Sequence, residues 1–164
     1  MPPVTQHIEN EAELAPFAAR LAAVLKPGDM LALYGTLGAG KTALSRALIR
    51  HLLDNPDEEV PSPTFTLVQM YDAPDFTLWH FDLYRLEDEE RDILELGWEE
   101  ARRGGVALVE WPERLGSLLP ANRLEINIDF DKNDLSENGQ QAAGDARVIT
   151  LTGHGVWAAR LADF

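Results

Sequence analysis

The feature that most constrains this chain is a glycine-rich segment, GTLGAGKT at residues 35–42, which fits the pattern G-x-x-x-x-G-K-[ST] at every fixed position. A short apolar run at residues 30–34 precedes it, and apolar residues with helical spacing follow from residue 42 to about residue 53. A buried strand, a glycine-rich loop and a helix in this order form a P-loop, whose backbone N–H groups and helix N-terminus face phosphate. The segment therefore predicts a nucleotide-binding site.

The fixed residues of this loop have separate predicted roles. The glycines permit positive φ angles and a close approach of the backbone to phosphate oxygens. Lys41 is expected to reach the β- and γ-phosphates as a mobile charge, and the hydroxyl of Thr42 to bind Mg²⁺. The expected nucleotide-binding residues of the segment are Gly35, Leu37, Gly38, Ala39, Gly40, Lys41, Thr42 and Ala43.

The rest of the chain predicts further helices and strands. Helical spacing covers residues 11–25, and a charged helix is expected at 86–103 with a break at Gly97; Trp98 beside it is either a partner anchor or part of the core. A polar, mobile loop is expected at 131–146 and a short terminal helix at 156–161. Strands are expected at 65–71, 77–81, 106–109, 122–130 and 147–152. This order predicts one α/β domain, residues 1–164, with a mixed, mainly parallel sheet flanked by helices.

Composition limits the classes of function. The chain has no cysteine, which excludes disulfides and cysteine-ligated zinc sites. Its formal net charge of −14 disfavours unaided binding to nucleic acid. No apolar run approaches the roughly 18 residues of a membrane helix, and the N-terminus lacks the features of a signal peptide. We therefore expect a soluble cytoplasmic protein with no membrane partner.

Two acidic residues that end apolar strands are candidates for the metal site. A P-loop enzyme needs an acid at the end of a neighbouring strand to hold Mg²⁺ directly or through water. Glu110 follows the apolar residues 106–109 and is the predicted Walker B acid; the alternative is a solvated strand-end glutamate. Asp82 closes the strand at 77–81 and is expected across the metal from Thr42; the alternative is a helix cap or a pair with Arg85.

Two further residues have open interpretations. His80 alternates with Asp82, and is either a general base or, as we favour, a histidine packed within its strand. Thr64 lies in the proline-rich segment 61–65, in the region that senses the γ-phosphate in many P-loop enzymes. Its hydroxyl is expected near Mg²⁺ or the attacking water; the alternative is a rigid turn with no role in the site.

Four motifs together resemble one family. GTLGAGKTAL, SPTFTLVQMY, HFDLYRL and LVEWPE occur in the order and spacing of the TsaE (YjeE) family. The resemblance implies a bacterial P-loop ATPase, with ATP and Mg²⁺ as cofactors, needed for threonylcarbamoyl modification (t⁶A) of adenosine 37 in tRNA. It implies TsaB and TsaD homologues as partners, with hydrolysis resetting their complex and tRNA reached only through them.

The resemblance also implies residue roles. The implied catalytic residues are Lys41, Asp82 and Glu110. Thr42, Glu110 and Asp82 are implied near the metal, and Thr64 belongs to a switch-like loop. The sequence departs from the family pattern at Thr36, usually acidic or Asn, and at Ala43, commonly Thr. Ala43 can still offer its N–H to the α-phosphate.

Two other functions share a P-loop. A small-molecule kinase usually has an arginine-bearing lid, whereas residues 131–146 contain a single basic residue, Lys132. A GTP-dependent switch has a guanine-specific N-K-x-D motif, which this chain lacks. Both alternatives are therefore less favoured than an ATPase that acts on a partner complex.

Overall fold

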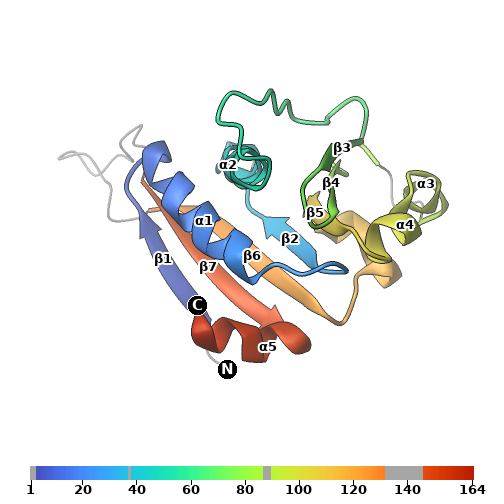
Figure 1. Ribbon diagram of the computed structural model, residues 1–164. Helices are drawn as coiled ribbons and strands as arrows, with labels where there is room; N and C mark the ends of the chain where they lie inside the picture. The colour runs from blue at the N-terminus through green and yellow to red at the C-terminus, as the bar shows by residue number, and fades with distance from the viewer. Residues whose placement is uncertain (1–2, 37, 87–89, 132–145) are drawn as a thin grey trace.

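A seven-stranded sheet with strand order β1-β7-β6-β2-β5-β4-β3 forms the centre of the computed structural model, which describes residues 3–36, 38–86, 90–131 and 146–164 (Figure 1). The central neighbours β6, β2, β5 and β4 run parallel, and the pairs β1–β7, β7–β6 and β4–β3 are antiparallel. The predicted α/β fold with a mixed sheet is therefore confirmed. The strands are β1 (Val4–Ile8), β2 (Met30–Tyr34), β3 (Val68–Asp72), β4 (Thr77–Asp82), β5 (Val106–Glu110), β6 (Arg123–Phe130) and β7 (Arg147–His154).

Helices cover both faces of the sheet (Figure 1). The helices α1 (Leu14–Val24), α2 (Lys41–Leu52) and α5 (Val156–Arg160) pack on one face. The helices α3 (Glu90–Glu95) and α4 (Trp98–Arg102) pack on the other, together with the 3₁₀ segment η2 (Pro112–Leu118). Two short 3₁₀ turns, η1 (Glu11–Glu13) and η3 (Leu161–Asp163), precede α1 and follow α5.

The strand β2 lies at the centre of this arrangement and is buried on both faces. Leu31 and Leu33 join the core beneath α1 and α2, whereas Met30 and Ala32 join the core beneath α4. This position explains why β2 appears in the sequence as a continuous apolar run rather than an alternating one. The loop that follows β2 therefore lies near the middle of the sheet, at the end where the parallel strands terminate.

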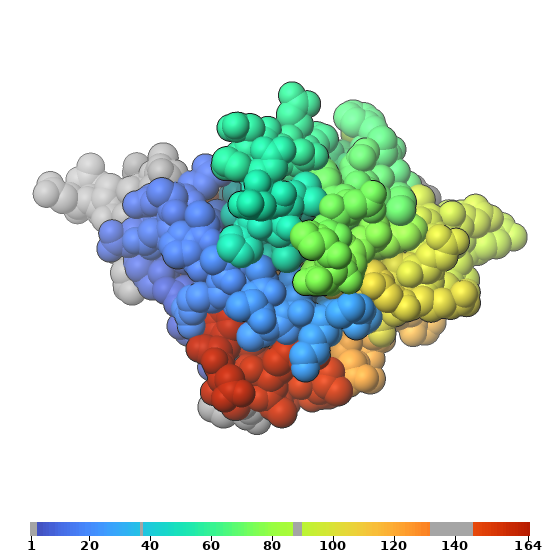
Figure 2. Space-filling view, in the orientation of Figure 1, coloured from blue at the N-terminus to red at the C-terminus, as the bar shows by residue number. Residues whose placement is uncertain are grey.

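Both ends of the described chain lie on the face that carries α1. The C-terminal residues pack against the first part of the chain (Figure 2). The Phe164 ring meets Phe17 edge-on with centroids 5.9 Å apart, and the guanidinium of Arg20 lies 4.4 Å from the same ring. These contacts join α1 to the C-terminus.

Several predicted boundaries were wrong. The strand predicted from residue 65 begins at Val68, because Leu67 has a left-handed φ of 69° and its N–H donates to the Pro63 carbonyl. β1 was not predicted. The break at Gly97 is confirmed as the left-handed residue that separates α3 from α4. Trp98 is buried, with its ring 5.4 Å from that of Phe81, so it belongs to the core and is no anchor for a partner. The predicted loop 131–146 lies outside the described residues except at its ends.

Candidate active site

The candidate site lies where parallel strands end at one edge of the sheet, the usual position of a ligand site in an α/β fold. The P-loop leaves β2 at this edge. In the register of the parallel strands, Leu33 pairs with Glu110, and Glu110 pairs with Asp82. The two acids that the sequence singled out are therefore brought next to each other and to the loop.

The loop conformation depends on glycine, and Gly35 and Gly40 show why. A Cβ on Gly35 would lie 2.8 Å from the Ile128 carbonyl oxygen, which is too close for any side chain. Gly40 has a φ of 113° and caps the N-terminus of α2, a conformation that other residues rarely adopt. The turn thus directs the start of α2, and its unpaired N–H groups, toward the site. Leu37 lies outside the described residues.

Lys41 is held by groups of the protein. Its Nζ donates to the Gly35 carbonyl at 2.6 Å and lies 3.6 Å from the centroid of the Trp111 ring. The side chain is 5% exposed, and burial lowers the pKa of Lys41, with the Glu110 carboxylate acting in the opposite direction. Trp111 is in the left-handed region (φ 61°), and its ring packs against that of Tyr84 at 4.9 Å.

Glu110 faces the P-loop. The hydroxyl of Thr42 donates to Oε1 of Glu110 at 3.1 Å, and the carboxylate is only 3% exposed. The residue is therefore not the solvated strand-end glutamate of the alternative interpretation. A hydroxyl and a carboxylate in direct contact form the pair that holds Mg²⁺ in P-loop enzymes.

Asp82 binds the proline-rich loop. Its Oδ2 accepts a hydrogen bond from Ser62 Oγ at 3.0 Å and lies 3.5 Å from Thr64 Oγ1. Its Oδ1 accepts a hydrogen bond from the backbone N–H of Tyr84 in an Asx turn, which is not the helix cap of the alternative interpretation, because the next described helix, α3, begins at Glu90. The guanidinium of Arg85 lies 4.4 Å from the Phe65 ring.

These side chains surround one hollow of about 320 Å³. The described residues contain no group of three or more His, Asp and Glu side chains that could enclose a metal. Such an enclosure is not what Mg²⁺ needs beside phosphates, because it takes one or two carboxylates and keeps its other positions for water and phosphate oxygens. Thr42, Glu110 and Asp82 fit that requirement. The residues lining the hollow are Gly38, Gly40, Lys41, Thr42, Ala43, Ser62, Thr64, Asp82, Tyr84, Glu110 and Trp111.

A family model described as "Threonylcarbamoyl adenosine biosynthesis protein TsaE" matches residues 8–141. The chain belongs to the TsaE family. A relative named tRNA threonylcarbamoyladenosine biosynthesis protein TsaE from Rickettsia felis is 43% identical over 127 residues, 77% of this chain and 73% of the relative. The protein of that name from Bacillus subtilis is 40% identical over 147 residues, 89% of this chain and 83% of the relative.

A solved structure agrees with this assignment. The crystal structure of Bacillus subtilis YdiB matches with a TM-score of 0.73 and 31% identity, over 98% of this chain and 93% of that one. The resemblance based on the four motifs is thus confirmed, and with it a family role in t⁶A biosynthesis. No helix in the described part of the chain has the length and hydropathy needed to cross a bilayer.

The buried side chain of His80 contacts Glu110. Its Nε2 lies 2.7 Å from Oε2 of Glu110. The ring is completely buried and does not line the hollow, so it is packed within its strand as the favoured interpretation predicted. A general base must reach the proton that it removes, and His80 is not placed to do so.

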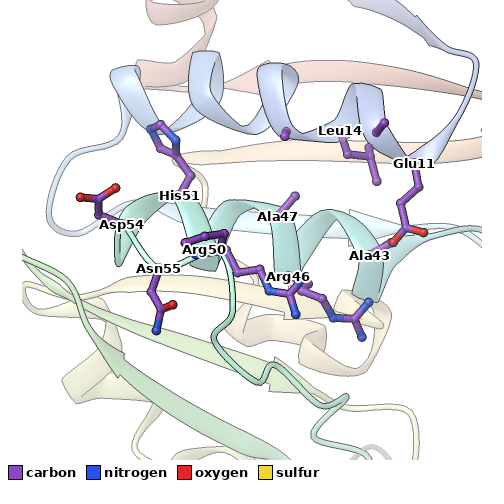
Figure 3. A pocket seen from close by; sticks show the side chains of 12 residues that line it. Glu11, Leu14, Ala43, Arg46, Ala47, Arg50, His51, Asp54 and Asn55 are labelled. Atoms are coloured by element: carbon purple, nitrogen blue, oxygen red, sulfur yellow. The ribbon is translucent and has the colours of Figure 1, made fainter.

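Two more hollows adjoin the P-loop in this member of the TsaE family. One of about 100 Å³ lies beside Gly40 and Ala43 and is bordered by Asn10 and Arg147, which the sequence did not mark as site residues. The other, of about 680 Å³, lies between α1 and α2 and contains Arg46 and Arg50 (Figure 3). It is the larger, but it contains none of the loop glycines and neither candidate acid.

Proposed function

We propose that this chain is the ATP-binding and hydrolysing component of the machinery that makes t⁶A37 in tRNA, and that residues 1–164 form one ATPase domain. The observation that carries the proposal is the contact between Thr42 and Glu110, directly beside the P-loop lysine. Membership of the TsaE family supports the tRNA-modification role, and the P-loop supports the triphosphate.

The proposed chemistry uses residues of one hollow. The N–H groups of the loop and the ammonium of Lys41 bind the β- and γ-phosphates. Thr42 and Glu110 would hold Mg²⁺, with Asp82 near it, and the ion would supply positive charge against the negative charge that develops on the phosphate oxygens. Glu110 or Asp82 accepts a hydrogen bond from the attacking water and orients it in line with the bond that breaks.

The proline-rich loop is the proposed sensor of the γ-phosphate. Ser62 and Thr64 touch Asp82, which lies at the end of β4 beside the metal pair. A change in the charge near Asp82 therefore changes the hydrogen bonds that fix this loop. Such loops transmit hydrolysis to partner proteins in other P-loop switches.

The nucleoside end is proposed to occupy the smaller hollow. It opens beside Gly40 and Ala43, where α2 begins, so a nucleotide whose phosphates lie on the P-loop can extend into it. Ile8, Leu14 and Ile149 supply apolar walls for a base. Arg147 donates to the Ala39 carbonyl and stacks over Phe130, which fixes one border of the hollow.

The proposed partners are TsaB and TsaD homologues, with tRNA reached only through them. The net charge of −14 supports this, because an acidic surface disfavours direct contact with a phosphate backbone. Low turnover by the isolated chain is part of the proposal, because an arginine that stabilises the transition state is often supplied by a partner.

The test is ATP hydrolysis by the purified chain, alone and with TsaB–TsaD and tRNA, with and without Mg²⁺. We expect slow Mg²⁺-dependent hydrolysis that changes when TsaB–TsaD is added. High turnover unaffected by TsaB–TsaD would contradict the partner role. Transfer of phosphate to a small acceptor, or preference for GTP, would favour the kinase or switch alternative.

A further inference from the structure

The strand β4 carries a charged contact that the proposed chemistry does not use. His80 lies two residues before Asp82 and on the same side of the strand. Its direct partner in the parallel register is Leu108, whereas Glu110 lies two residues further along β5. The imidazole therefore reaches diagonally forward, and its Nε2 meets Glu110 Oε2 at 2.7 Å.

The direction of this hydrogen bond follows from its partner. An ionised carboxylate can only accept hydrogen bonds, so Nε2 carries a hydrogen and donates the hydrogen bond to Glu110. The other ring nitrogen, Nδ1, is buried and has no hydrogen-bond partner among the described residues. An unsatisfied buried polar atom destabilises a fold, whereas an apolar side chain of similar size at this position would not. Packing alone therefore does not account for a histidine here.

The two oxygens of Glu110 differ in their neighbours. Both lie within reach of Thr42 Oγ1, with Oε1 the nearer at 3.1 Å against 3.4 Å for Oε2, but only Oε2 also accepts a hydrogen bond from His80. The bond to His80 thus fixes the rotation of the carboxyl group about its last bond. Without it, a carboxylate at the end of a flexible side chain has several orientations of similar energy.

We propose that His80 is the positioning residue for Glu110: its Nε2–H holds one oxygen so that the other faces Thr42, the partner with which Glu110 would hold Mg²⁺. The inference rests on the proposed function, because it assigns a role within the same nucleotide site. Hydrogen bonds to metal-binding carboxylates commonly have this effect, and their loss weakens metal affinity about 10–100-fold. His80 acts through Glu110 and does not itself line the hollow.

Three substitutions separate this role from packing. In His80→Gln the side-chain amide reaches about as far as Nε2 and can donate to Glu110. In His80→Asn the amide is equally polar but one methylene too short, and His80→Leu supplies volume without a donor. The Asn and Gln variants are a matched pair, because both bury an amide and only one can reach Glu110.

The measurement is calorimetric binding of ADP at a series of Mg²⁺ concentrations, and again in excess chelator, with thermal unfolding of each variant. We expect the apparent Mg²⁺ affinity to fall about 10–100-fold in His80→Asn and His80→Leu, and to stay close to that of the wild-type protein in His80→Gln. ADP affinity in chelator is expected to be the same in all four proteins, because the phosphates then contact the loop and Lys41 alone.

The outcomes distinguish the positioning role of His80 from the proposed ATPase function. Wild-type Mg²⁺ dependence in His80→Leu, or an equal loss in Gln and Asn, would overturn the positioning role while leaving the ATPase proposal intact. A uniform loss of ADP affinity in chelator that follows the unfolding temperature would show that His80 only supports the fold. Absence of nucleotide binding in the wild-type chain would overturn the proposed function, and this inference with it.

Discussion

The ammonium of Lys41 lies 3.6 Å from the centroid of the Trp111 ring and 2.6 Å from the Gly35 carbonyl, so the two ends of the P-loop and the residue after Glu110 meet at one charge. A cation over an indole face gains electrostatic stabilisation, and a buried one loses hydration. Burial lowers the pKa of Lys41 below its ordinary value of 10.5, although the Glu110 carboxylate acts in the opposite direction.

The lowered pKa predicts how phosphate binding depends on pH. Bound phosphate favours the ammonium form and raises the pKa again, so binding at high pH must restore a proton that the free protein has lost. ADP affinity measured in chelator should therefore be flat near neutrality and then fall, by about tenfold per pH unit, above the lowered pKa of the free protein.

The control for this prediction is Lys41→Arg, which keeps the charge because arginine stays protonated in this range. Its affinity should be weaker at neutral pH, because guanidinium geometry differs from that of ammonium, but should show no decline in the same window. An equal decline in both proteins would assign the effect to another group. Isothermal titration between pH 7 and 10.5 makes the comparison.

Substitution of Glu110 should separate binding from hydrolysis. Glu110→Gln keeps the shape of the side chain but removes the charge that faces Thr42. We expect the affinity for ADP in chelator to stay unchanged and the hydrolysis rate with TsaB–TsaD to fall by about 100-fold or more. Glu99→Gln on the exposed surface of α4 is the matched control and should hydrolyse ATP normally. Normal hydrolysis by Glu110→Gln would show that Glu110 is not the Walker B acid.

The sequence predicted the centre of the site better than its borders. The strand β2, the loop and α2 are adjacent in the chain, and their pattern is local, so their order could be read directly. Asp82 and Glu110 end parallel strands, and such ends meet at one sheet edge. The contact of Lys41 with Trp111 depends on the left-handed conformation of Trp111, and no pattern of residue types indicates that conformation.

The edges of the fold were predicted least well. β1 is a short strand, VTQHI, with alternating burial, and within the described part of the chain it pairs with β7 alone, more than a hundred residues away in sequence. Its pairing energy therefore comes from contacts that local periodicity does not contain. The sequence did not mark Asn10 and Arg147 as site residues for the same reason. The long-range pairing of β1 with β7 brings the segments that carry them together at the smaller hollow.

A buried ion pair indicates a position at which a substitution should destabilise the fold. Asp29, directly before β2, accepts hydrogen bonds from Arg160 Nη1 at 2.5 Å and from the Lys26 N–H at 2.6 Å, and is 6% exposed. Removal of one partner leaves a buried charge, which costs roughly 3–5 kcal/mol. Asp29→Ala should lower the free energy of unfolding in urea by about that amount, whereas exposed Asp57→Ala should change it little.

The proline-rich loop carries the most exposed large apolar side chain of the described residues. Phe65 is 81% exposed and stacks with Arg85, directly after the Thr64 that touches Asp82. Exposed aromatic and arginine side chains commonly dominate protein interfaces. Because this pair adjoins the proposed γ-phosphate sensor, we expect it to contact the partner complex and to report the nucleotide state.

Phe65→Ala should therefore weaken binding to TsaB–TsaD by about tenfold or more, since central interface aromatics contribute upwards of about 1–2 kcal/mol. ADP affinity of the isolated chain should not change, because the Phe65 ring does not line the nucleotide hollow. Val156→Ala, also exposed but on α5, is the control and should bind the partners normally. Surface-immobilised TsaB–TsaD measures both variants, and equal affinities for the two would exclude Phe65 from the interface.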